Sequence, residues 1–200
     1  FNEEWKTYDC GSISLSGIEI DSTNESTLYN SLVLDNDKYN IVIMHGQIGQ
    51  INLNAMKNKG IDYLALGHVH EYQNGPIDNR GIYCYSGCLE GRGFDECGAK
   101  GFVVLDIDEQ KLTAGFSFIP FAYRNLYTIY VDVTGATSKQ DVAAKIEDEL
   151  AKNPYSSRSL VKIVLVGEVD VDCEINTDFL KDMFEEYFYY EKVYDETKLL

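Results

Sequence analysis

The residues best suited to metal chemistry in this chain are its three histidines, His45, His68 and His70. His68 and His70 are two positions apart, so in extended backbone both imidazoles point to the same side. Imidazole nitrogen binds zinc, iron, nickel and manganese, which leaves the identity of an ion open. A histidine that follows a strand is also commonly an ordinary hydrogen-bonded side chain. The pattern therefore predicts a metal site only if the three rings meet.

Two apolar segments precede these histidines and must position them. Residues 41–44 form a continuous apolar run, typical of a strand buried on both faces, which ends at His45. Apolar residues then recur at helical spacing over residues 48–60, and a second buried strand is expected over residues 61–66, followed by Gly67 and His68. This order predicts a βαβ unit. Because ligand sites form at the carboxyl ends of parallel strands, we expect the rings to converge there if the two strands are neighbours.

The remaining pattern predicts a mixed α/β (α+β) fold class with two domains, residues 1–120 and 121–200. The first domain adds strands on either side of the βαβ unit, at residues 13–20, 82–85, 101–107 and 112–119. The second domain has the order strand, helix, strand, helix, at residues 126–133, 138–152, 160–166 and 177–190.

Composition limits the classes of partner and compartment. Seventeen Lys and Arg residues against 33 Asp and Glu residues give a formal net charge of −16. Nucleic-acid affinity comes largely from basic side chains that displace counterions, so this surface disfavours direct contact with a phosphate backbone. Five cysteines without CxxC spacing indicate neither a disulfide framework nor a zinc ribbon, which favours a reducing, cytoplasmic setting. No apolar run reaches the roughly 18 residues of a membrane helix, so we expect no membrane contact.

Two other groups of residues have both a structural and a functional interpretation. Tyrosines within residues 187–194 would suit stacking with single-stranded bases. An apolar stripe from Phe179 to Tyr187 on the predicted helix favours packing in a core instead. Arg92 and Lys100 could contact a phosphate, but we expect solvated or structural roles for them. Neither group is therefore assigned to a site.

The ordered series of motifs around the histidines resembles one family of enzymes. His45 with the glycine after it, and the Gly-His-Val-His of residues 67–70, are similar to the last two signature motifs of the calcineurin-like metallophosphoesterases. Three later segments narrow the resemblance to DNA-repair exonucleases of the SbcD and Mre11 type: residues 82–89, 94–96 and 100–105. Cys88 stands where that pattern more usually has serine.

The resemblance implies a fold and a chemistry. Residues 39–120 would belong to the second half of a β-sandwich flanked by helices, and residues 121–200 resemble, in layout only, a small α/β capping domain. Two divalent ions, commonly manganese, would lie in a phosphodiester-cleaving site, with His45 and His68 on one ion and His70 on the other. DNA would be the substrate of the full-length parent, and an ATPase of the SbcC or Rad50 type its partner.

The departures from the family are as informative as the match. The family's upstream motifs, an Asp-x-His, a Gly-Asp and a Gly-Asn-His-Asp, need further histidines, and all three histidines of this chain are already assigned. Together with the Phe start, this predicts the C-terminal half of a phosphoesterase domain with its cap, inactive alone. Two alternatives stay open. The chain could belong to a metallophosphoesterase for a small phosphodiester or nucleotide, or be a non-catalytic module that docks a partner ATPase.

Overall fold

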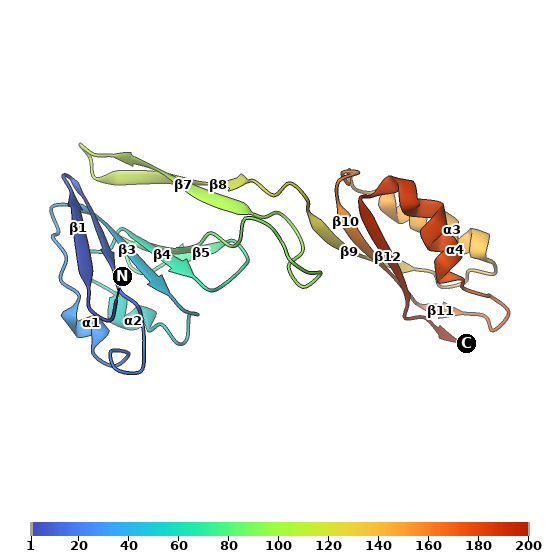
Figure 1. Ribbon diagram of the computed structural model, residues 1–200, viewed down its shortest axis with the longest axis horizontal. Coiled ribbons are helices and arrows are strands. Elements are labelled where there is room, and N and C mark those ends of the chain that lie inside the picture. Colours follow the sequence, from blue (N-terminus) through green and yellow to red (C-terminus); the bar gives the residue numbers. More distant parts are fainter. Residues whose placement is uncertain (1, 200) are drawn as a thin grey trace. The chain divides into compact units, whose positions relative to one another are not determined.

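The computed structural model describes residues 2–199, which form two compact units. Unit 1 contains residues 2–89 and 100–121, and unit 2 contains residues 90–99 and 122–199. Both units combine strands with short helices, so the chain has a mixed α/β fold (Figure 1). No helix in the described residues is long and apolar enough to cross a membrane.

Unit 1 is built on a six-stranded sheet with the order β1-β2-β3-β4-β6-β5. Its strands are β1 (Lys6–Cys10), β2 (Ile13–Gly17), β3 (Tyr39–His45), β4 (Tyr63–Gly67), β5 (Gln73–Pro76) and β6 (Ile82–Tyr85). Strands β2, β3, β4 and β6 are parallel to one another, and β1 and β5 are antiparallel edge strands. The two strands predicted to lead to the histidines are therefore confirmed as parallel neighbours, β3 and β4.

One face of this sheet packs against two single-turn helices. These are α1 (Leu28–Ser31) and α2 (Leu53–Met56), and they place the fully buried Leu28 and Met56 against apolar residues of the central strands such as Leu64. Burial of side chains of this size contributes about 1.5–3 kcal/mol each relative to exposure. Each helix is too short to be stable alone, so this core is what holds it in place.

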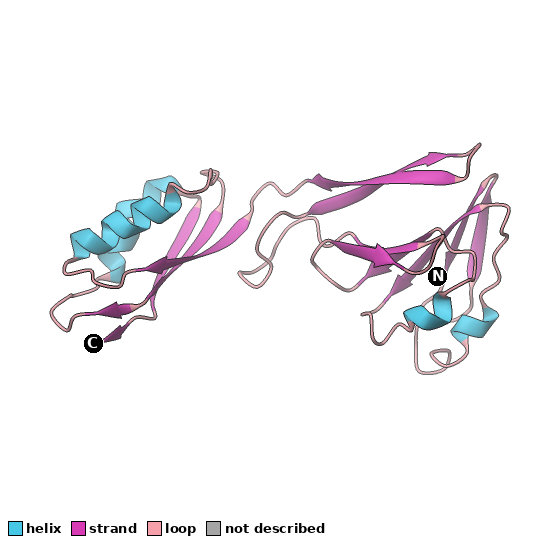
Figure 2. Ribbon diagram, turned by 180° about the vertical axis from the view of Figure 1, so that it is seen from behind, coloured by secondary structure: helices cyan, strands magenta, loops and turns pink. Residues whose placement is uncertain are grey.

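The opposite face of the sheet is covered by a hairpin of β7 (Gly101–Asp108) and β8 (Thr113–Pro120), as Figure 2 shows for this unit. Val103 on the hairpin packs in a small cluster with Tyr63 and Cys84 of the sheet. Burial raises the pKa of the Cys84 thiol, so this thiol stays protonated and acts as an apolar side chain. The strands predicted at residues 101–107 and 112–119 are confirmed, and they pair antiparallel in a separate two-stranded sheet.

The helix predicted over residues 48–60 is wrong in its extent, because only Leu53–Met56 is helical. Gly49 has a φ of +107°, which is incompatible with a right-handed helix. The helix begins only at Asn52, whose side chain accepts a hydrogen bond from the N–H of Ala55. The apolar spacing that indicated a longer helix has another cause, since Ile51 is buried from within a loop.

Hydrogen bonds among Asn40, Asp62 and Arg80 fix the starts of β3 and β4 against each other. The N–H of Asn40 donates to Oδ2 of Asp62 at 2.7 Å, and the N–H of Asp62 donates to the carbonyl of Asn40 at 3.0 Å. The Arg80 guanidinium donates Nε to Oδ1 and Nη2 to Oδ2 of Asp62, both at 2.8 Å. The reciprocal bonds between Asn40 and Asp62 support the register of the two strands at the end away from His45, and Arg80 holds the Asp62 carboxylate in place.

We expect Arg80→Ala to destabilise unit 1 by about 2–3 kcal/mol, because it leaves the largely buried Asp62 carboxylate without its counterion. Urea unfolding followed by fluorescence measures this directly, since Trp5 is the only tryptophan in the chain and lies in unit 1. Lys111→Ala, also in unit 1, is the matched control, because it removes an ion pair with Asp108 from a side chain that is 76% exposed. Equal small effects of both substitutions would contradict the prediction.

Unit 2 is built on a parallel three-stranded sheet with the order β12-β10-β9. The sheet is formed by β9 (Leu126–Asp132), β10 (Leu160–Val166) and β12 (Tyr190–Asp195). Two helices lie on one face of it, α3 (Lys139–Leu150) and α4 (Thr177–Phe184), as Figure 2 shows. A separate two-stranded pair consists of β11 (Glu168–Val169) and β13 (Lys198–Leu199).

The predicted start of α3 is confirmed, whereas the predicted length of the last helix is wrong. The hydroxyl of Ser138 accepts a hydrogen bond from the N–H of Asp141 at 3.2 Å and caps α3. The last helix, expected over residues 177–190, ends at Phe184 and is followed by a 3₁₀ turn, Glu185–Tyr187, and then by β12. The cause is the run of aromatic and β-branched residues after the turn, which favours a strand that pairs with β10.

The apolar stripe predicted on this helix is only partly buried. Leu180 and Phe184 are fully buried in the unit 2 core. Met183, on α4, is 45% exposed, and Tyr187 is 52% exposed because it lies in the 3₁₀ turn rather than on the helix. The expected core packing is therefore confirmed for Leu180 and Phe184 and wrong for Met183 and Tyr187.

Glu191 on β12 is a buried carboxylate, and in the described residues neither of its oxygens has a hydrogen-bond partner. Burial raises its pKa to about 7; the positive charge of Lys181 opposes this shift, and the negative charge of Glu185 adds to it. The folded protein therefore holds the proton of Glu191 across a pH range in which the unfolded chain, with a glutamate pKa of about 4.3, releases it. The stabilisation from this protonation is complete below about pH 4.3 and is lost as the pH rises through 7.

We expect Glu191→Gln to leave the free energy of unfolding of unit 2 almost unchanged near pH 4.5 and to raise it at pH 8 by on the order of 1 kcal/mol. Urea unfolding followed by helical circular dichroism tests this, because the two longest helices, α3 and α4, belong to unit 2. Glu186→Gln removes an exposed carboxylate nearby and serves as the control. A gain for Glu191→Gln that does not depend on pH would show that charge burial is not its cause.

Candidate metal site

His45 and His68 lie at the carboxyl ends of two neighbouring parallel strands. His45 is the last residue of β3, and in the register of the pair it lies opposite Gly67, the last residue of β4. His68 follows Gly67 directly, and both histidines are exposed. The strand pairing therefore brings together two side chains that are 23 positions apart in the sequence.

The two imidazole rings are in contact. Their centroids are 5.5 Å apart and their planes are nearly perpendicular, at 89°. In a tetrahedral site with metal–nitrogen distances near 2.1 Å, two ligand nitrogens lie about 3.4 Å apart. The separation of the ring centroids is compatible with two imidazoles that share one ion. The pair supplies nitrogen ligands alone, so a hard ion such as manganese would need additional oxygen ligands.

Backbone conformation at the end of β4 makes room for this contact. A Cβ atom on Gly67 would lie 2.7 Å from Nδ1 of His45, so only glycine lets the ring of His45 lie against this strand. His68 has a φ of +108°, which is rare for a residue with a side chain and costs of order 1–3 kcal/mol. Strain of this kind persists only where the surrounding structure enforces it, and it commonly marks functional sites.

The loop that follows His45 is held by the buried phenol of Tyr85. Its hydroxyl donates to the carbonyl of Gly46 at 2.7 Å and accepts from the N–H of Ile48 at 3.0 Å. Burial raises the pKa of Tyr85, so the hydroxyl keeps the proton that it donates. The N–H of Gly46 also donates to the carbonyl of Gly67 at 3.2 Å, which continues the β3–β4 pairing past His45.

His70 is exposed and lies two residues beyond His68, in a segment that is held through its main chain. The Nζ of Lys100 donates to the carbonyl of His70 at 3.0 Å, and the N–H of Cys88 donates to the same oxygen at 3.4 Å. Lys100 is 4% exposed, so its amine is a buried anchor for this segment. The structural role expected for Lys100 is therefore confirmed.

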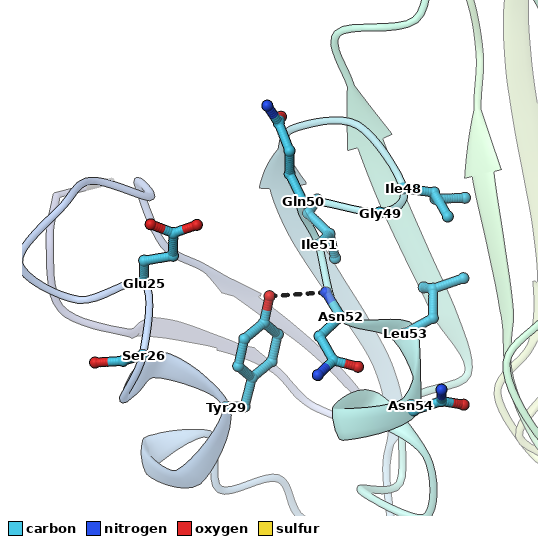
Figure 3. A pocket seen from close by; sticks show the side chains of 10 residues that line it. All are labelled: Glu25, Ser26, Tyr29, Ile48, Gly49, Gln50, Ile51, Asn52, Leu53 and Asn54. Atoms are coloured by element: carbon cyan, nitrogen blue, oxygen red, sulfur yellow. Dashed lines mark hydrogen bonds between the residues drawn. The ribbon is translucent and has the colours of Figure 1, made fainter.

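A polar pocket of about 560 Å³ borders the loop after β3 (Figure 3). Glu25 and Tyr29 line one side, and Gln50, Asn52 and Asn54 line the other. The N–H of Asn52 donates to the hydroxyl of Tyr29 at 2.9 Å, which ties the two sides together. Amide and carboxylate groups of this kind suit hydrogen bonding to a polar ligand.

Sequence reasoning did not find the roles of Tyr85 and of the Asn40–Asp62–Arg80 group. Tyr85 hydrogen-bonds a residue 39 positions away, and no local pattern indicates such a partner. The one available signal was Asp62, a charged residue next to an apolar strand, because a carboxylate in that position needs a partner. Arg80, in the turn that precedes β6, is that partner.

The fold and these contacts define a mixed α/β protein in which two contacting histidines, His45 and His68, lie at the carboxyl edge of a parallel sheet. Comparison of the chain with models of protein families gives no match, and comparison with curated proteins gives none either.

We expect Gly67→Ala to displace the ring of His45, because the new methyl group would lie 2.7 Å from Nδ1. The cross-relaxation between the His45 and His68 ring protons measures this in solution by NMR, and it should be lost. Gly115→Ala in β8 is the control, because a Cβ atom there meets nothing within 4 Å. An unchanged ring-to-ring signal in Gly67→Ala would contradict the described packing.

Proposed function

We propose that unit 1 supplies the histidine ligands of a metal-dependent phosphodiesterase centre of the SbcD exonuclease type. The observation that carries this proposal is the contact of the His45 and His68 rings at the carboxyl ends of β3 and β4. The order of the motifs, with His70 two residues further on, supports the same assignment. The motif resemblance adds DNA as substrate and an SbcC-type ATPase as partner to the proposal.

In this proposal each part of the unit has a chemical task. His45 and His68 hold one divalent ion, and His70 contributes to a second. Divalent ions in such a site bind the phosphate and lower the pKa of a water molecule, which becomes the nucleophile. Tyr85 and Lys100 touch main-chain carbonyls of the histidine segments, so they position the ligands rather than take part in the reaction.

The ligand count makes the proposed centre incomplete in this chain. Three neutral imidazoles divided between two ions are too few to hold a pair of hard cations tightly. The remaining ligands, carboxylates above all, would come from residues other than these three histidines. We therefore propose that the 200 residues bind metal weakly and do not turn over substrate alone.

A second candidate function is hydrolysis of a small phosphodiester or nucleotide at the same site. The observation in its favour is the net charge of −16, which opposes binding of a long polyanion much more than binding of a small one. The polar pocket beside the loop after β3 is large enough for a ligand of this size.

A titration of the whole chain with Mn²⁺ and with Zn²⁺ tests the site. We expect about one weakly bound ion per chain, and an affinity reduced roughly tenfold or more in His68→Ala, because one of two adjacent ligands is lost. Gln50→Ala, in the loop after β3, is the matched control and should bind as the unaltered chain does.

Assays with bis-p-nitrophenyl phosphate and with a DNA oligonucleotide complete the test. Neither substrate should be hydrolysed. Two tightly bound ions with turnover would contradict the incomplete centre, and a preference for the small ester would then favour the second candidate. Metal binding that does not depend on the histidines would overturn the site and leave a non-catalytic module for an ATPase partner as the better function.

A further inference from the structure

Unit 2 contains a pocket of about 470 Å³ that the proposed function does not use. It lies where α3 ends, and its walls come from the end of that helix, the loop after it and the residues that precede β12. Leu150 and Pro154 contribute aliphatic surface, and Tyr155, Tyr187 and Phe188 contribute aromatic rings. Its volume lies within the range of pockets that bind small molecules.

The three aromatic rings form angled walls rather than a stack. Tyr155 and Phe188 have centroids 6.4 Å apart and planes at 79°, and Tyr187 and Phe188 have centroids 6.3 Å apart and planes at 49°. Asn153 donates its side-chain N–H to the hydroxyl of Tyr155 at 3.3 Å, and Tyr127 packs edge-on against the same ring at 4.9 Å. The pocket is therefore bordered by rings held at fixed angles, and the faces of such rings carry negative potential.

Two further features make the pocket electronegative. Glu147, on the last turn of α3, lines it, and within the described residues this carboxylate forms no ion pair. Lys152, the first basic residue that follows Glu147 along the chain, is paired with Glu149 instead. The carboxyl end of α3 also carries the negative end of the helix dipole, and its last turn has no basic side chain to offset it.

We propose that this pocket binds a small organic cation, specifically an ammonium group that carries several alkyl substituents. Aromatic faces, an unpaired carboxylate and a helix carboxyl terminus favour positive charge, and the aliphatic walls favour an apolar body around it. A strongly hydrated inorganic cation would gain little from such walls, and an anion would be repelled by Glu147. The net charge of −16 increases the encounter rate with any cation.

The test compares two ligands that differ only in charge. Choline and its uncharged isostere 3,3-dimethyl-1-butanol are titrated into the whole chain at 150 mM salt, and amide shifts are followed by NMR. Choline should bind about fivefold or more tightly than the isostere, since a cation–aromatic contact is worth about 1 kcal/mol or more. The shifts should be confined to residues 147–155 and 187–188.

Two substitutions and their controls locate the interaction. Tyr187→Leu removes a ring that is 52% exposed, and Glu147→Gln removes the carboxylate, so neither should unfold the chain. Each should weaken choline binding about threefold or more and leave the isostere unchanged. Tyr130→Leu, at a ring that is 61% exposed on β9, and Asp148→Asn, next to Glu147, lie outside the pocket and should have no effect.

Three outcomes would overturn the proposal. Equal binding of choline and its isostere would reduce the pocket to a hydrophobic cavity. Equal losses in the control variants would show that the overall negative charge, not the pocket, attracts the ligand. Tighter binding of a peptide with trimethyllysine than of choline, with shifts that extend beyond the pocket, would replace the small molecule by a protein partner.

Discussion

The parallel pairing of β3 with β4 is the constraint on which the histidine site depends. At one end of the pair, Asp62 bridges the backbone of Asn40 and the guanidinium of Arg80. At the other end, the same register places His45 opposite Gly67. A slip of one residue would turn every side chain of a strand to the opposite face of the sheet. The ring contact at the carboxyl edge therefore depends on an ion pair at the amino edge.

The strands of this site were predictable from sequence because burial on both faces leaves a continuous apolar run. Residues 41–44 and 63–66 have that pattern, and the glycines and histidines after them mark where each strand ends. Helix lengths were less predictable. Ile48, Ile51 and Met56 have helical spacing, yet the spacing of apolar residues alone does not distinguish a helix from a loop that buries one of them. The φ of Gly49 excludes a helix at this position, and a φ angle cannot be read from a sequence.

Local sequence patterns did not predict the contacts between segments that are distant in the sequence. The hydroxyl of Tyr85 and the amine of Lys100 both bond main-chain carbonyls of the histidine segments, and neither residue belongs to a recognisable motif for that role. Tertiary structure also determines the conformation of residues 185–195. The end of a helix was expected there, but strand β12 forms instead and pairs with β10. In both cases a buried polar group or an unpaired strand edge finds its partner only after the chain has folded.

The path of the chain between the units has a practical consequence for dissecting the protein. Residues 90–99 leave unit 1 and return to it, but they pack within unit 2, where the N–H of Gly98 donates to the carbonyl of Leu126 and Cys97 lies beside Thr128. If residues 1–121 were expressed alone, residues 90–99 would lack strand β9, against which they pack. If residues 122–200 were expressed alone, the edge of β9 would lose its contact with residues 90–99. An unpaired strand edge of this kind favours aggregation. Neither segment is therefore suited to separate expression. Replacement of residues 90–99 by a short glycine linker is the better route to an isolated unit 1.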